Sequence, residues 1–157
     1  MTQQQQAATG PQVIMQKIFL ADCSVEVPGA PLVFTKEWKP QMDVQINTDV
    51  KKVADSTHQV TVSVTVKAKL DDEVAYLVEV QQAGIFVLQG FAEQDDVRPV
   101  LGAYCPNTLF PYLRECVSEL IQKAGFPQFL LQPVNFDALF QEYLKQQAQP
   151  ADAATAH

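Results

Sequence analysis

The sequence of 157 residues lacks most of the motifs on which catalysis and metal binding depend. Its two histidines, His58 and His157, lie far apart, and its three cysteines show no C-x-x-C spacing. Neither a zinc site nor a disulfide framework is therefore expected. Neither the G-x-x-x-x-G-K-[ST] phosphate loop nor the G-x-G-x-x-G dinucleotide loop occurs, so nucleotide binding has no support. We expect no metal and no cofactor.

Membrane and secretory segments are also missing. No apolar run approaches the ~20 residues that a membrane helix needs. The amino terminus has neither the basic region nor the apolar region of a secretory signal. Because unpaired cysteines also suit a reducing compartment, we expect a cytoplasmic protein.

Basic residues are scarce, with 11 Lys and Arg against 18 Asp and Glu and a net charge of -7. Nucleic acid binding needs a basic surface, so this balance argues against it. The charge suits a basic protein partner, although it can equally serve only to keep a domain soluble.

The sequence predicts one domain between two unstructured ends. Residues 1–12 and 146–157 are rich in Gln, Ala and Thr and are expected to be disordered. Residues 13–145 are expected to fold as a single domain.

Its first half predicts an antiparallel sheet. Between Gln59 and Leu70, apolar residues alternate with polar ones, which is typical of a strand with one packed and one wet side. Asp71-Asp72 predicts a tight hairpin, and the return strand extends from Glu73 to about Gln89. Weaker alternation predicts two earlier strands, in one of which Phe19 and Cys23 share a face.

Its second half predicts helices. Apolar residues recur at helical spacing from Leu109 to Ala124, with Gly125 as the stop and Pro111 expected in the first turn. A shorter helix begins after Asn135, the expected N-cap. The predicted fold is α+β: a four-stranded antiparallel meander sheet with two C-terminal helices packed on one side.

The sequence gives little support for a catalytic site. A nucleophilic cysteine needs a neighbouring base, and His58 is the one interior histidine. Cys105 and Cys116 are better interpreted as buried apolar residues. Trp38 suits either the core or an exposed anchor, since indole tolerates mixed surroundings. We expect that the protein is not an enzyme.

Several long motifs resemble the SecB family of bacterial protein-export chaperones, and the resemblance extends from about Gln16 to Gln147. The most specific are EVQQAGIF from Glu79, LGAYCPN from Leu101, LFPY from Leu109 and PVNFDALF from Pro133. The loop 92–100 matches no family motif, and the tail carries one acid, Asp152.

The resemblance implies an ATP-independent chaperone that binds unfolded precursor proteins and delivers them to the motor ATPase SecA. It implies a homotetramer built as a dimer of dimers, with no nucleic acid and no membrane insertion. Family residues that contact the motor correspond to Asp22, Glu26, Leu77 and Glu79. Those of the client groove correspond to Trp38, Val44, Ile46, Phe110 and Phe140. Subunit association is implied for Val78, Val80, Gln82, Cys116 and Leu120.

Other functions stay open. The solvent-facing side of a sheet ordinarily carries polar residues, and this alone can account for Asp22, Glu26 and Glu79. The main alternative is a small-molecule binding module in which Trp38 and the two groove phenylalanines line a closed pocket. An enzyme that uses Cys105 is a third possibility.

Overall fold

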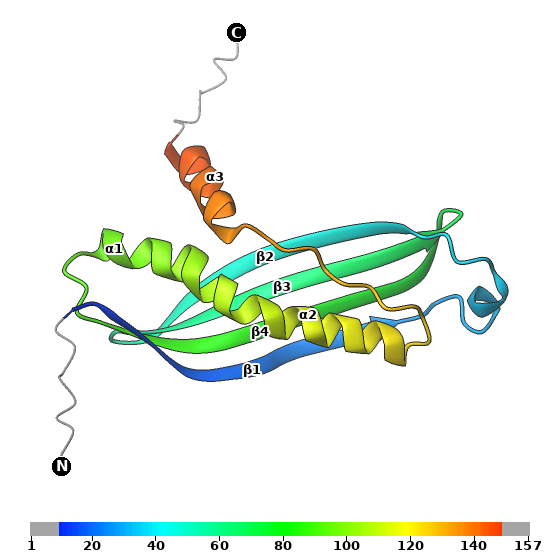
Figure 1. Cartoon of the computed structure of the whole chain (residues 1–157), viewed down its shortest axis with the longest axis horizontal. Helices are drawn as coiled ribbons and strands as arrows, with labels where there is room; N and C mark the ends of the chain where they lie inside the picture. The colour runs from blue at the N-terminus through cyan, green and yellow to red at the C-terminus, as the bar shows by residue number, and fades with distance from the viewer. Residues whose placement is uncertain (1–9, 149–157) are drawn as a thin grey trace, which may run out of the picture.

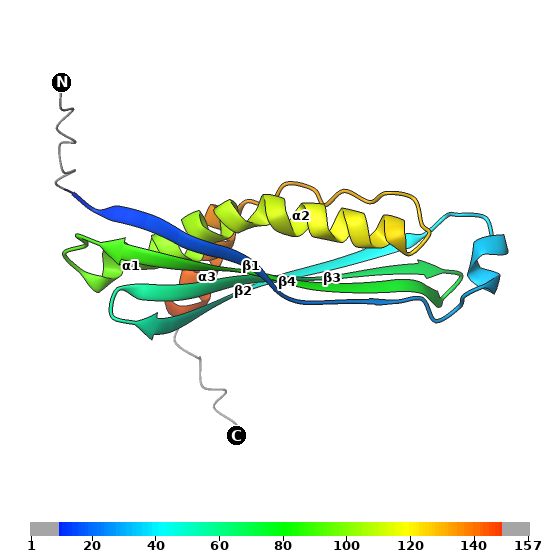
Figure 2. The ribbon, with the colours of Figure 1, turned by 90° about the horizontal axis from the view of Figure 1, so that it is seen from below.

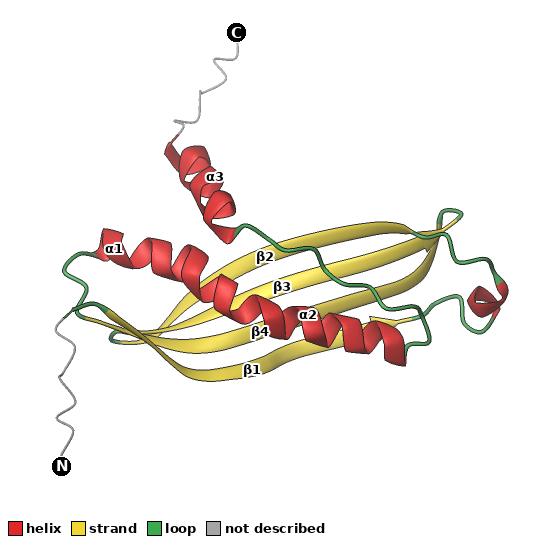
Figure 3. Cartoon of the chain, in the orientation of Figure 1, coloured by secondary structure: helices red, strands yellow, loops and turns green. Residues whose placement is uncertain are grey.

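The structure, a computed structural model, describes residues 10–148. Its strands are β1 (Gln12–Glu26), β2 (Gln41–Ala54), β3 (Thr57–Leu70) and β4 (Glu73–Gln89). Its helical elements are the 3-10 turn η1 (Leu32–Thr35), α1 (Gln94–Pro99), the π-helical turn η2 (Val100–Tyr104), α2 (Cys105–Lys123) and α3 (Phe136–Ala148). The predicted α+β class and four-stranded antiparallel sheet are confirmed (Figures 1 and 3). Most of the predicted disordered ends, 1–12 and 146–157, lies outside the described residues.

The strand order is β1-β4-β3-β2, so the sheet is only partly a meander. Strands β2, β3 and β4 follow one another through hairpins, but β1 pairs with β4 rather than with β2. The connection from β1 to β2, which includes η1, must therefore cross one end of the sheet (Figure 1). The hairpin predicted at Asp71-Asp72 is confirmed, and both residues have positive φ angles, 48° and 66°, as a type I′ turn requires.

The alternation in β3 separates the two faces of the sheet as predicted. The even-numbered residues from Val60 to Leu70 are buried, and α2 packs on this face (Figure 2). Burial of each valine or leucine side chain among them contributes roughly 1.5–3 kcal/mol relative to exposure. Gly84 lies where α2 closely approaches β4, because a Cβ there would be 2.9 Å from Cδ2 of Leu109.

The first strand departs from simple alternation. Its pairing with β4 shifts between Leu20 and Asp22, so Ala21 is an extra residue in a β-bulge. Phe19 faces Ala83 on the open side, whereas Cys23 faces Val80 on the helix side. The prediction that Phe19 and Cys23 share a face is therefore wrong, because one extra residue exchanges the faces of a strand.

The helical run begins earlier than the sequence predicted. Helix α1, the π-helical turn η2 and helix α2 follow one another without a break and form one helical run, as Figure 1 shows. The prediction that Pro111 lies in a first turn is wrong, since Pro111 lies inside α2. Pro99 and Pro106 lie in the same run, and each proline removes one backbone donor. The predicted stop at Gly125 is confirmed: Gly125 has a φ of 95°, and the N–H of Phe126 bonds to Ile121.

The last helix projects away from the sheet. Asn135 is the N-cap as predicted, because its Oδ1 accepts a hydrogen bond of 3.0 Å from the N–H of Ala138. Only Phe136 of α3 is buried, and α3 packs against η2 rather than on the sheet (Figure 1). The expectation of two helices on one face therefore holds for α2 but not for α3. Within residues 10–148, no helix is both long and apolar enough to span a bilayer.

Candidate functional site

An apolar groove lies between β2, η2 and α3. It has a volume of about 610 Å³, and its walls combine aliphatic and aromatic side chains with a few polar ones. The residues that line it are Ile46, Asn47, Thr48, Asp49, Val50, Arg98, Leu101, Gly102, Phe136, Leu139, Phe140 and Tyr143. The groove exists because α2 lies over β3 and β4 and leaves the helix-facing side of β2 largely uncovered.

Two predicted groove residues lie in these walls. Ile46 lines the groove from β2 and Phe140 lines it from α3, so residues nearly a hundred positions apart meet. Val44 shares the face of β2 that carries Ile46 and is 38% exposed, but it lies outside the walls of the groove.

Phe110 supports the groove from behind and does not line it. It is buried, and its ring packs edge-on against Phe136 with 5.8 Å between the centroids. The guanidinium of Arg114 lies 5.2 Å from the centroid of the Phe110 ring, within the range of a cation–π contact. Phe110 therefore holds Phe136, a groove residue, in place.

Trp38 belongs to a separate aromatic cluster beyond the C-terminal end of α2. Its ring lies 5.1 Å from Phe126 and 6.0 Å from Tyr76, measured between centroids. Trp38 is half-buried, whereas the neighbouring Phe34 is 49% exposed. Burial raises the pKa of Tyr76 to about 12, so its hydroxyl stays protonated. Trp38, Phe110 and Phe140 therefore do not line one closed pocket.

Sequence reasoning missed most of the groove. Leu139 and Tyr143 are 46% and 52% exposed in its walls, and Val50 is 42% exposed. The apolar residues of α3 recur at helical spacing, but this spacing does not reveal whether another element covers them. Leu101 and Gly102 belong to the family motif LGAYCPN, but no periodic pattern placed them in a groove wall, since η2 lies in a helical run with three prolines.

The four predicted motor-contacting residues lie together on the open face of the sheet. Glu26 pairs with Leu77 across the β1–β4 ladder, and Ser24 pairs with Glu79. Asp22 and Glu79 line a shallow depression of about 140 Å³ on this face. None of the ion pairs within residues 10–148 uses the carboxylates of Asp22, Glu26 or Glu79. We call these four residues the acidic face.

The residues predicted for subunit association divide into two groups. Val78, Val80 and Gln82 are 0%, 1% and 6% exposed on the face beneath α2, so they offer no free surface. Cys116 and Leu120 are half-buried on α2 and remain partly accessible. Burial, with the nearby Cys23, raises the pKa of Cys116.

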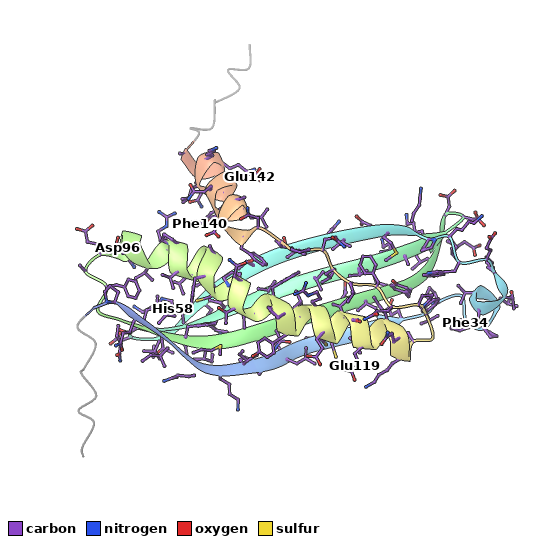
Figure 4. The ribbon with its side chains drawn as sticks, in the orientation of Figure 1. Phe34, His58, Asp96, Glu119, Phe140 and Glu142 are labelled. Atoms are coloured by element: carbon purple, nitrogen blue, oxygen red, sulfur yellow. The ribbon has the colours of Figure 1, made fainter. Side chains whose placement is uncertain are left out.

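The candidate catalytic residues do not form a reactive pair. Cys105 is fully buried, and this burial raises its pKa to about 12, so the thiol is protonated at neutral pH. His58 lies under the helical run at one end of the sheet (Figure 4), and its Nδ1 is buried without a hydrogen-bond partner. Burial, then the charge of Lys52, lowers its pKa. Residues 10–148 hold no cluster of three or more metal-binding side chains.

A family model described as preprotein translocase subunit SecB matches residues 4–147. The chain belongs to the SecB family. It is 46% identical to the protein-export protein SecB of Methylococcus capsulatus, over 93% of this chain and 94% of the relative. It is 49% identical to that of Alcanivorax borkumensis, over 89% and 90%. The expected chaperone role in protein export is thereby confirmed.

A solved structure shares the fold of this SecB-family chain. It is a SecB-like chaperone of Mycobacterium tuberculosis in complex with a peptide from an antitoxin. The TM-score is 0.65 at 16% identity, and the match covers 78% of this chain and 90% of that one.

Proposed function

We propose that the chain is an ATP-independent chaperone that binds unfolded precursor proteins in the groove between β2, η2 and α3. The observation that carries this proposal is an open apolar groove whose walls include Val50, Leu139 and Tyr143, all more than a third exposed. Exposed apolar side chains gathered in one groove are typical of a binding surface. A peptide ligand in the related SecB-like chaperone is in keeping with such a groove.

Such a groove accepts many sequences because apolar burial is non-directional and contributes about 25 cal/mol for each Å² removed from water. The groove also borders β2, which is an edge strand of the described sheet. Its unpaired backbone groups can bond to an extended chain regardless of that chain's side chains. By binding the unfolded state, the protein draws clients away from their folded state without ATP.

A homotetramer fits this weak and general mode of binding. Several grooves on one particle make each later contact intramolecular, at effective concentrations on the order of mM. Partly exposed Cys116 and Leu120 on α2 are candidates for the subunit contacts. The site of action is the cytoplasm, before export.

The acidic face is the docking surface for the motor SecA in this proposal. Asp22, Glu26 and Glu79 are exposed and lie on the side of the sheet opposite α2. Carboxylates that carry no internal ion pair can attract a basic partner and raise its rate of association. Because this face and the groove are separate, the motor can bind while a client is held.

A pair of valines on β2 tests the groove. Val50 lines the groove and is 42% exposed, whereas Val53 is 54% exposed on the same strand outside it. We expect Val50→Asp to weaken binding about tenfold, because a carboxylate would lose its water when the client is bound. Fluorescence anisotropy with labelled, reduced and carboxymethylated α-lactalbumin, which is permanently unfolded, measures the affinity.

Val53→Asp is the matched control, and its affinity is expected to equal that of the unmodified chain. Equal losses in both variants, or no loss in Val50→Asp, would refute client binding in this groove.

A further inference from the structure

The attachment of α3 depends on few contacts. Phe136 is its single buried residue, and Phe140 is half-buried in the wall of the groove (Figure 4). The helix packs against η2, and the segment 127–135 before it has no regular secondary structure. The position of α3, and with it one wall of the groove, is therefore set largely where α3 meets η2.

The ring of Phe140 lies directly on Gly102 of η2. A Cβ at position 102 would overlap Cδ2 of this ring and would lie 2.7 Å from Cε2 and 3.1 Å from Cγ. Because these atoms belong to a rigid ring, the ring as a whole would have to move. The missing side chain of Gly102 thus leaves a socket that the Phe140 ring fills.

The backbone itself does not require glycine at this position. Gly102 does not have the positive φ of Gly90 or Gly125, so other residues can adopt its conformation. Glycine is also a poor helix former, and alanine at the same place would favour the helix. The close approach of Phe140 therefore gives a structural reason for glycine here.

This socket lies in η2, where the hydrogen bonding of the helical run from α1 to α2 departs from the α-helical pattern. The N–H of Cys105 bonds to the carbonyl of Val100, five residues earlier, which widens the turn. Pro106 has no N–H, so the carbonyl of Gly102 lacks its ordinary α-helical donor. Turns of this kind are often found at functional sites.

We propose that Gly102 is a positioning residue of the groove, which acts by seating Phe140 and so holding α3 against η2. This inference rests on the proposed function. Gly102 also lines the groove, but the role proposed here is indirect and acts through Phe140. Its role is to keep the α3 wall at the distance at which Leu139, Phe140 and Tyr143 can close on a bound chain.

The test is a double-mutant cycle with Gly102→Ala, Phe140→Ala and the double variant. Gly102→Ala is expected to displace α3 from η2 and so to speed amide hydrogen exchange in residues 136–148. It should also weaken binding of carboxymethylated α-lactalbumin about tenfold. The loss should lie in a faster dissociation rate, with the association rate unchanged. In the Phe140→Ala background no ring occupies the socket, so the added Gly102→Ala should have no further effect.

Gly10→Ala is the matched control, because a Cβ at Gly10 would meet no atom within 4 Å. Additive losses in the double variant would overturn the inference. Unchanged exchange in α3, or tighter binding by Gly102→Ala, would also overturn it. If Gly102→Ala does not fold while the double variant does, this rescue supports the seating of Phe140 on Gly102. Failure of both variants to fold contradicts it.

Lack of binding by the unmodified chain would instead refute the proposed function. The exchange measurement would still test whether Gly102 seats Phe140.

Discussion

At the scale of single residues, His58 is the clearest source of pH dependence in the described chain. Burial and the positive charge of Lys52 lower its pKa from 6.5, and its buried Nδ1 has no hydrogen-bond partner. The unfolded chain therefore binds a proton at a higher pH than the folded chain. Between these two pKa values the unfolded state holds more protons, so stability must fall as the pH falls.

We expect the free energy of unfolding to decrease as the pH is lowered from 7.5 to 5.5, with the loss starting near the unfolded pKa of about 6.5. His58→Gln should remove this component. Urea denaturation at several pH values measures it. His157→Gln is the control and should keep the full dependence, and an unchanged slope in His58→Gln would contradict the assignment to His58.

At the scale of elements, the acidic face depends on the bulge in β1. Ala21 is the extra residue, and after it Asp22 and Glu26 face the open side beside Leu77 and Glu79. Without the bulge, these two carboxylates would turn toward α2, since a one-residue shift exchanges the faces of a strand. The bulge therefore allows β1 to supply both the packed and the acidic surface.

We expect Asp22→Lys combined with Glu79→Lys to weaken binding of SecA at least tenfold at low salt, because two attractive charges become repulsive. Titration calorimetry with SecA measures the affinity, and client binding should be unchanged. Glu37→Lys combined with Glu142→Lys makes the same change of charge away from this face and should retain affinity. Equal effects of the two pairs would show that only net charge matters.

Local patterns in the sequence predicted the elements that depend on neighbouring residues. The alternation in β3, the turn at Asp71-Asp72, the N-cap Asn135 and the stop at Gly125 each follow from short-range chemistry. The bulge at Ala21 and the π turn were not predicted, because neither changes the composition of its segment. Pro111 was misplaced because a proline usually marks a helix start.

At the scale of the whole molecule, the sequence could not predict which apolar residues are covered and which are exposed. Apolar residues of a core and of a groove have the same composition, and only the path of α2 over β3 and β4 decides which are covered. Ile46 and Phe140, which the family resemblance implies for the client groove, both line the groove of this structure. Phe110 and Trp38 do not line it, because both pack against other aromatic rings inside the chain.

The central claim is that the groove between β2, η2 and α3 receives an unfolded chain. Amide hydrogen exchange of the protein, alone and with saturating carboxymethylated α-lactalbumin, tests this most directly. We predict slower exchange in residues 46–50, 101–102 and 136–143, which contribute the walls, and no change in residues 77–81 of the acidic face. Protection confined to the acidic face, or no protection of the groove at saturation, would contradict the account.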